Sequence, residues 1–172
     1  MKFSWKICVS VLAFSLLIVG IGGYALLSAL FQSSFQREVK SAADENRMLQ
    51  YSFAAYWTTT VQDRSSGFPE TDVRRAAQAM QEGMSGTELR FQLYNQEGRE
   101  LYDSGAEEIL RDSQREVLFS AASGETGARM MVRTGEGFGL ATVSTVLMED
   151  GTLLYLETDR DVTALFADRE SQ

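Results

Sequence analysis

The sequence contains no histidine, one cysteine and one proline among its 172 residues. Histidine is the commonest general base and a frequent metal ligand, and it is the usual side chain that titrates near neutral pH, so its absence excludes a serine–histidine triad. The single cysteine, Cys8, excludes an intramolecular disulfide, so a folded domain must be held by packing alone. We therefore predict no catalytic residue, no metal site and no cofactor in this chain.

Charge is also absent from Ile7 to Phe31. A helix of about 25 residues rises on the order of 37 Å, which exceeds the roughly 30 Å hydrocarbon core of a bilayer. This stretch predicts a transmembrane helix, with residues 1–31 forming a membrane segment. Two other interpretations are a buried core helix and a cleaved signal peptide, with Gly23-Tyr24-Ala25 as a possible cleavage site. The apolar run continues past that site to Phe31, which favours a permanent anchor.

The flanking charges predict the orientation of this helix. Lys2 and Lys6 precede it without any acidic residue, so the positive-inside rule places the N-terminus in the cytoplasm and the rest of the chain outside. Without these two lysines, 14 basic and 24 acidic side chains remain. Such an acidic domain is not expected to bind nucleic acid or anionic lipid.

A heptad pattern follows the apolar stretch, in a predicted helix from Gln32 to about Asp63. Its membrane-proximal part is a candidate dimer seam formed by Phe35, Val39, Ala42, Asn46 and Leu49. An asparagine at one core position of such a seam can fix the register of a parallel dimer. Alternatively, the stripe packs on the protein's own sheet. Both can hold, with the membrane-proximal half pairing and the distal half packing inward.

The remaining chain, about 140 residues with the long helix, is sufficient for one domain. Hydrophobic periodicity and turn residues predict a helix, two strands, a partly helical crossover, three strands and a last helix. The expected ranges are Thr71 to Met84, Leu89 to Tyr94, Arg99 to Asp103, Ala106 to Ala122, Ala128 to Thr134, Phe138 to Met148, Thr152 to Thr158, and a helix capped by Asp161. This order predicts an α+β domain over residues 32–160: a PAS-like (PDC-like) antiparallel sheet of about five strands with helices on one face. Residues 161–172 are expected to form an exit helix.

Two motifs are better explained by ordinary structure than by chemistry. The segment Gly135-Glu-Gly137-Phe-Gly139 resembles a phosphate-binding loop, but it lies between two strands and no Lys-Ser/Thr follows. It predicts a hairpin. The acidic residues near Glu97 and Glu107 fit no calcium-loop spacing and predict a solvated face.

A small-ligand pocket is possible between the sheet and the helices. The candidate ligand-binding residues are Trp57, Arg90, Arg133 and Tyr155. An arginine on a strand can bind a carboxylate through two parallel hydrogen bonds. The alternative for each arginine is an exposed side chain that pairs with a surface acid.

Three short phrases resemble the N-terminal part of bacterial membrane sensor histidine kinases. They are Asn46-Arg-Met-Leu-Gln-Tyr-Ser-Phe, Leu101-Tyr-Asp-Ser-Gly105, and Leu156-Glu-Thr-Asp-Arg-Asp-Val-Thr-Ala-Leu-Phe-Ala-Asp-Arg-Glu170. The resemblance implies a first transmembrane helix, an extracytoplasmic sensor domain and an exit helix leading toward a second transmembrane segment. This sequence contains neither a phosphoacceptor histidine nor an ATP-binding motif. The resemblance therefore implies signal reception here and catalysis only in a longer parent protein.

The function expected from the sequence is signal reception by a two-component sensor histidine kinase in a bacterial cell membrane. The expected partners are the membrane, a second copy of the chain, and an unknown extracytoplasmic signal that is a small molecule or a protein. Alternatives are the sensor region of a chemotaxis or cyclase receptor, a secreted or anchored binding protein, and a pilin-like structural protein. The apolar stretch lacks the glutamate that a pilin would need.

Overall fold

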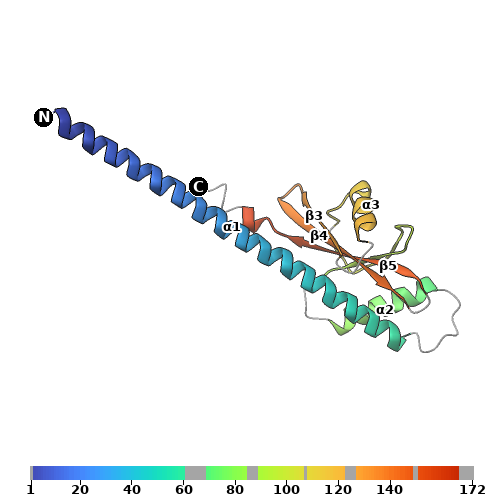
Figure 1. Ribbon diagram of the computed structural model, residues 1–172. Coiled ribbons are helices and arrows are strands. Elements are labelled where there is room, and N and C mark those ends of the chain that lie inside the picture. The colour runs from blue at the N-terminus through green and yellow to red at the C-terminus, as the bar shows by residue number, and fades with distance from the viewer. Residues whose placement is uncertain are drawn as a thin grey trace. The chain divides into compact units, whose positions relative to one another are not determined.

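The computed structural model describes residues 2–60, 69–84, 89–106, 108–122, 127–148 and 151–166. Helices and strands follow one another in the predicted order (Figure 1). Their bounds are α1 Lys2–Thr60, α2 Pro69–Gly83, β1 Gln92–Tyr94, β2 Glu100–Asp103, α3 Asp112–Ala121, β3 Ala128–Arg133, β4 Phe138–Leu147 and β5 Leu153–Asp161.

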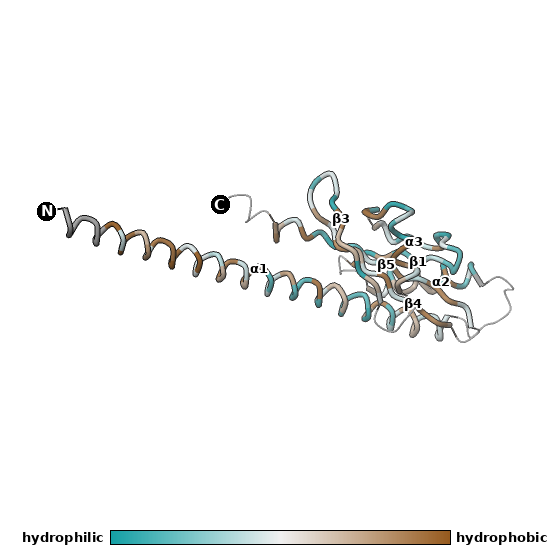
Figure 2. The backbone as a smooth tube through the Cα atoms, turned by 45° about the horizontal axis from the view of Figure 1, so that its top comes forward, coloured by the Kyte–Doolittle hydropathy of each residue, from teal (hydrophilic) through white to brown (hydrophobic). Residues whose placement is uncertain are grey.

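The chain divides into two compact units, Met1–Glu38 and Val39–Gln172. The first unit is the N-terminal part of α1, and its hydrophobic residues stand out in Figure 2. Large apolar side chains such as Val19 and Tyr24 are exposed there, at 70% and 71%. Of the helices that the structure describes, α1 alone is long and apolar enough to cross a membrane, which is compatible with a single-span membrane protein.

The second unit contains a five-stranded sheet in the order β2-β1-β5-β4-β3, in which all neighbours are antiparallel. Glycines in the left-handed region make the turns: Gly98, with φ of 80°, donates its N–H to the carbonyl of Asn95 in the β1–β2 turn. Gly151, with φ of 86°, lies between β4 and β5. The predicted α+β class, with a long N-terminal helix followed by a five-stranded antiparallel sheet, is confirmed.

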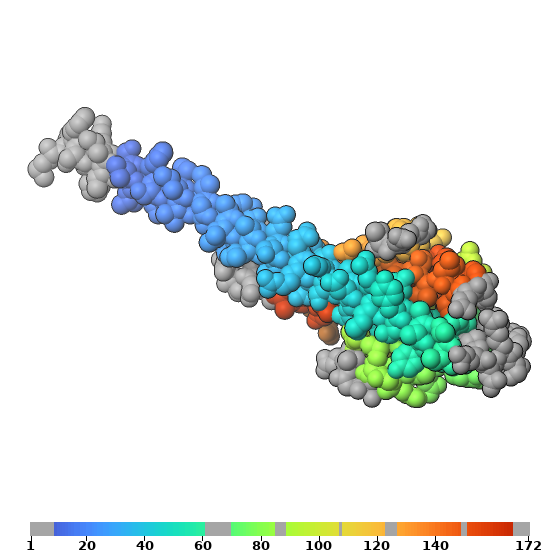
Figure 3. Space-filling view, turned by 60° about the horizontal axis from the view of Figure 1, so that its bottom comes forward, coloured from blue at the N-terminus to red at the C-terminus, as the bar shows by residue number. Residues whose placement is uncertain are grey.

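Helices cover both faces of this sheet. One face packs on α1 and α2, which lie side by side in Figures 1 and 3, through a core of Leu49, Phe53, Val73, Ala76, Ala77, Met80, Phe91, Leu93, Leu101, Val146, Met148, Leu154 and Leu156. The other face packs on α3 through Tyr94, Leu110, Leu118, Phe119, Ala122, Val132, Ala141, Val143 and Tyr155. The prediction placed the helices on one face. That is right for α1 and α2, whereas α3 lies on the opposite face.

Two strands differ from their predicted extents. β1 has only three residues, and all are buried, including Gln92 and Tyr94, because helices cover both of its faces. The prediction of a half-buried strand from Leu89 was therefore wrong. β5 continues three residues beyond the predicted end at Thr158, because its pairing with β4 continues to Asp161 opposite Gly139.

After β5, the described chain makes a short helical turn over residues 164–166. Asp161 does cap this turn, since its Oδ1 accepts the N–H of Thr163 at 2.8 Å. Hydrogen bonds from the side chain of Thr163 and from its backbone N–H lower the pKa of Asp161. Phe166 packs on Phe138 with 4.3 Å between ring centroids. Residues 167–172 lie outside the described part of the chain, so the exit helix stays a prediction.

Candidate functional site

The candidate site lies where β5 extends past the short strand β1. β5 pairs with β4 from Leu153 to Asp161, but it pairs with β1 only from Tyr155 to Glu157. Among the described strands, the end of β5 therefore has a neighbour on one edge only. A cavity of about 820 Å³ opens beside it, and its lining includes Leu89, Arg90, Ile109, Phe138, Asp159 and Asp161.

Gly139 lets the segment before α3 close over this end of the sheet. A Cβ atom built on Gly139 would lie 2.6 Å from Cδ1 of Ile109, too close for any side chain without movement. Glycine at this position of β4 thus allows Ile109 to pack directly on the strand. Ile109 forms an apolar wall of the cavity next to its charged residues.

Asp159 is the most unusual residue of the site. The residue is partly exposed, but both of its carboxyl oxygens are buried, and neither has a hydrogen-bond partner among the residues that the structure describes. Burial raises the pKa of Asp159 to about 8, and the nearby carboxylate of Glu157 adds to the shift while Arg115 opposes it. At neutral pH this side chain is therefore mostly protonated and uncharged.

A buried ion pair joins α3 to β5 beside Asp159. Nε of Arg115 donates to Oε2 of Glu157 at 3.0 Å, and the two side chains are 8% and 0% exposed. Arg115 also donates to Glu108 at 3.1 Å and to Asp112 at 3.4 Å, and its guanidinium lies 4.9 Å from the ring centre of Tyr94. α3 is thereby held over the sheet by one cation in contact with several carboxylates.

Burial and charge oppose each other in this pair. Burial raises the pKa of Glu157, and Arg115 counteracts that shift. Burial by itself lowers the pKa of Arg115. The carboxylate of Glu157 nevertheless holds the pKa of Arg115 above its ordinary value. Oε1 of Glu157 has no hydrogen-bond partner, so the pair leaves one buried oxygen unsatisfied. Burial, assisted by Glu157, also raises the pKa of the Tyr94 hydroxyl, which donates to Gln92 at 3.0 Å.

On the opposite face, the end of β5 is bound to α1. Nδ2 of Asn46 donates to Oγ1 of Thr158 at 3.0 Å and to the carbonyls of Thr142 and Leu156 at 3.2 and 3.3 Å. Arg160 donates to Oγ of Ser41 at 2.9 Å and forms an ion pair with Glu45. Thr158 and Arg160 face α1, whereas Asp159 between them faces the side that carries α3.

Three of the predicted seam residues are already buried by contacts within one copy of the chain. Ala42 and Leu49 are buried in apolar clusters of the second unit, and Asn46 is 2% exposed in its hydrogen bonds to the sheet. This arrangement matches the alternative in which the distal half of the stripe packs inward. Phe35 and Val39 are only partly buried.

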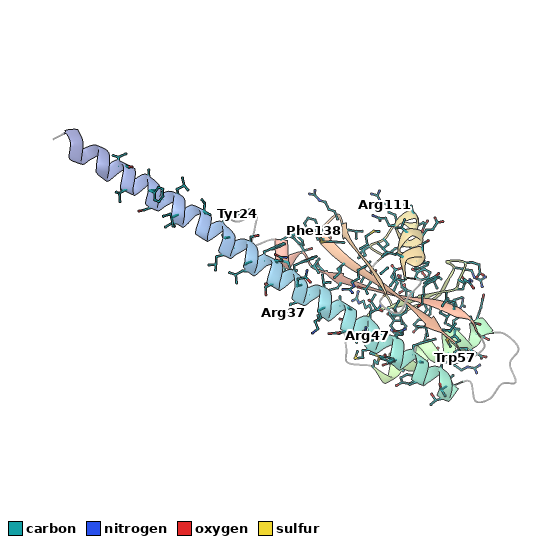
Figure 4. The ribbon with its side chains drawn as sticks, in the orientation of Figure 1. Tyr24, Arg37, Arg47, Trp57, Arg111 and Phe138 are labelled. Atoms are coloured by element: carbon teal, nitrogen blue, oxygen red, sulfur yellow. The ribbon has the colours of Figure 1, made fainter. Side chains whose placement is uncertain are left out.

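The four predicted ligand-binding residues are not brought together. Arg90 lines the cavity, but Trp57 packs against the core on the α1 side, and Tyr155 stacks on Phe119 with centroids 4.2 Å apart. Arg133 is exposed at the end of edge strand β3, opposite Phe138. Figure 4 shows Trp57 on α1 and Phe138 at the far end of the sheet.

Sequence reasoning missed Arg115, Glu157 and Asp159. The sequence did contain a signal for the two acids. Glu157 and Asp159 lie two residues apart in the segment Leu156-Glu-Thr-Asp159, so they alternate with the residues of the other strand face. The prediction ended this strand at Thr158 and so placed Asp159 outside the sheet. Within the described ranges, no three acidic or cysteine side chains gather as a metal-binding group.

Comparison with known proteins gives structural likenesses, among them a distant one to a sensor domain. No family model matches the chain, and no curated protein matches it. The structure is similar to that of the sensor domain of the zinc-responsive histidine kinase CzcS from Pseudomonas aeruginosa, with 17% sequence identity and a TM-score of 0.35. The similarity covers 69% of this chain and 94% of that one. At this distance, the function must be inferred from the chain's own residues.

Proposed function

We propose that this chain is the signal-receiving, extracytoplasmic part of a membrane-bound sensor histidine kinase of a two-component system. The observation that carries the proposal is the composition of α1. Its first part is apolar with exposed side chains, as a membrane span requires, and its second part supplies Leu49, Phe53 and Asn46 to the core of a sheet domain. One helix thus belongs both to the membrane segment and to the domain that would receive a signal.

The cavity beside β5 is the proposed reception site. It combines an exposed guanidinium, Arg90, with the apolar Ile109 and Phe138 and the unpartnered Asp159. Arg90 is suited to bind a ligand carboxylate through two hydrogen bonds. Sites with an apolar wall and a few fixed polar groups are typical of small-molecule binding.

β5 offers a short route from this cavity to α1. Asp159 lines the cavity, and its two chain neighbours, Thr158 and Arg160, bind Asn46, Ser41 and Glu45 of α1. A ligand that shifts the end of β5 therefore changes the contacts that hold α1. Such a shift would select between two arrangements of the helix, and it would reach a kinase core in a longer parent protein.

Dimerisation belongs to the same proposal. The membrane-proximal positions Phe35 and Val39 are proposed to pair in parallel with a second copy. Both are only partly buried, although Val39 also packs against the cluster of Ala42, Leu140 and Val162. The N-terminus is proposed to lie in the cytoplasm and the sheet domain outside, because Lys2 and Lys6 precede the apolar stretch.

A ligand screen on the full chain in detergent micelles tests the reception site. We expect a member of a panel of carboxylic acids and amino acids to raise the unfolding temperature, because a ligand at 100 times its Kd stabilises the folded state by about 2.7 kcal/mol. The variant Arg90→Ala should lose this stabilisation. Arg133→Ala is the matched control, since Arg133 is an exposed strand arginine that does not line the cavity. Equal responses of the two variants would show that the cavity is not the site.

A further inference from the structure

We propose that Asp159 is a proton-binding site, and that loss of its proton loosens α3 and the segment before it from the sheet. The observation behind this proposal is an imbalance of buried charge. Two carboxyl groups, Asp159 and Glu157, are buried on one face of β5, and one buried cation, Arg115, faces them. The pair Arg115–Glu157 is balanced by itself, so Asp159 fits this site best without charge.

The strand geometry keeps the two carboxyl groups together. Residues two apart on a strand point to the same face, so Glu157 and Asp159 are neighbours on the side that carries α3. Arg115 is already committed to Glu157 at 3.0 Å and to Glu108 and Asp112. Within the described part of the chain, neither oxygen of Asp159 has a hydrogen-bond partner. An ionised Asp159 would therefore be a buried charge without compensation, which proteins avoid by binding a proton.

The other elements around Asp159 add little positive charge. Its partner on β4 is Ala141, whose partner on β3 is Met130, so both of these strands present uncharged side chains. From the segment before α3, Glu108 raises the proton affinity of Asp159 further.

The cavity wall contributes charges of both signs. Its acids are Asp161, Glu136 and Glu45, and its cations are Arg90 and Arg160. Arg160 is engaged by Glu45 on the opposite face of the sheet. Arg90 is the remaining cation of the wall; it is exposed, and no ion pair joins it to Asp159 in the described structure. Because its carboxyl oxygens are buried, solvation of an ionised Asp159 in its present position requires movement of the covering layer.

That covering layer is α3 with the segment that precedes it. Ile109 packs on Gly139, which is paired with Asp161, and Arg115 reaches the sheet through Glu157. Water or Arg90 can reach the Asp159 carboxylate if this layer lifts, and the layer is bound to the sheet partly by charges that an ionised Asp159 disturbs. A rise in pH should therefore open the layer, and a fall in pH should close it.

The sign of the pH dependence follows from proton linkage. A carboxyl group that binds its proton more tightly in the closed state than in the open one favours closing at low pH. The closed state loses stability as pH rises from about 4, the ordinary range of an aspartate, toward about 8. Above about 8, Asp159 is ionised in both states and the dependence levels off. The titration concerns the folded domain alone; only its consequence, that external pH is part of the signal, rests on the proposed function.

Thermal unfolding of the full chain in detergent micelles between pH 5 and pH 9 provides the first test. Asp159→Asn mimics the protonated side chain, so this variant should unfold at a higher temperature than the unmodified chain at pH 8. The difference should shrink as pH falls toward 5. Asp44→Asn, which removes an exposed carboxyl group on α1, is the matched control and should follow the unmodified chain. The proposal is overturned if Asp159→Asn has the same pH profile as the unmodified chain.

Hydrogen exchange of the unmodified chain gives a second test that needs no variant. After correction for the intrinsic pH dependence of exchange, the opening constant of amides 112–121 should rise by nearly tenfold per pH unit between pH 5 and 7, and it should level off near pH 8. Constant protection across this range would also overturn the proposal. Either result is independent of membrane topology, so failure of the titration is distinguishable from failure of the proposed function.

Discussion

Single residues join the layers of this domain at a few buried polar points. Asn46 connects α1 to three acceptors on two strands, and Arg115 connects α3 to β5. Both side chains are buried, and an unmatched polar group is costly in a buried position. These residues therefore fix the position of each helix on the sheet more precisely than apolar packing would.

Replacement of Asn46 by alanine is expected to destabilise the domain by about 1–3 kcal/mol, because the carbonyls of Thr142 and Leu156 lose a buried donor. Chemical denaturation in micelles, followed by circular dichroism, measures the change. Asp44→Ala on the exposed side of the same helix is the control and should have little effect. Equal stability of both variants would mean that the hydrogen bonds of Asn46 contribute nothing.

Arg115→Met should cost more, about 3–5 kcal/mol, because it leaves the buried carboxylate of Glu157 without a cation. The double variant Arg115→Met/Glu157→Met should recover most of this loss, since neither partner is then charged. Denaturation midpoints of the two variants and of the exposed control Arg133→Met are compared. A double variant less stable than Arg115→Met would contradict this account.

At the scale of elements, α1 changes its role along its length. From Ile7 to Phe31 it is apolar and free of charge, and from Ala42 onward its apolar stripe is buried in the second unit. Between these parts, Phe35 and Val39 continue the same heptad stripe but are only partly buried. The heptad pattern alone does not distinguish pairing with a second copy from packing on a sheet, since both need one apolar stripe.

Disulfide crosslinking in a Cys8→Ser background tests the pairing. We expect Phe35→Cys and Val39→Cys to crosslink efficiently in membranes, because these positions face the proposed seam. Leu49→Cys should crosslink poorly, since Leu49 is 0% exposed within its own unit. Arg37→Cys is the control off the seam. Equal crosslinking at Phe35 and Arg37, or efficient crosslinking at exposed Tyr51, would refute this seam.

At the scale of the whole molecule, the proposed function requires that the chain cross a membrane once in a fixed direction. The apolar stretch of α1 meets the length requirement, and the two lysines before it predict the direction. The net negative charge of the rest does not oppose translocation, because acidic residues contribute little to topology.

Reporter enzymes fused after Gln172 test this topology. A reporter that is active only in the periplasm should be active, and one that is active only in the cytoplasm should be silent. A Lys2→Glu/Lys6→Glu variant, which removes the basic flank, should weaken the preference. Activity of the cytoplasmic reporter alone, fused to the unmodified chain, would refute the topology and with it the proposed extracytoplasmic sensor.

Local pattern was sufficient to predict much of this protein. Three local patterns each predict a structure from neighbouring residues alone. They are the run without charge, the heptad stripe, and the alternating segments separated by glycine turns. The order of the elements and the α+β class follow from such patterns, and Arg90, one of the four candidate ligand-binding residues, lines the cavity.

Only the tertiary structure decided where the long-range partners lie. Pairing of β5 with β4 up to Asp161 extends the strand over three residues that the sequence placed after its end, and the shortness of β1 leaves the cavity beside them. The contact between Arg115 and Glu157 spans 42 residues, and those of Asn46 with the sheet span 96 or more. Such contacts depend on how whole layers pack. The hydrophobic periodicity of one segment does not indicate which face of another segment it will pack against. For that reason the sequence determined the elements and their order, while the buried acid at the end of β5 became visible only in the folded domain.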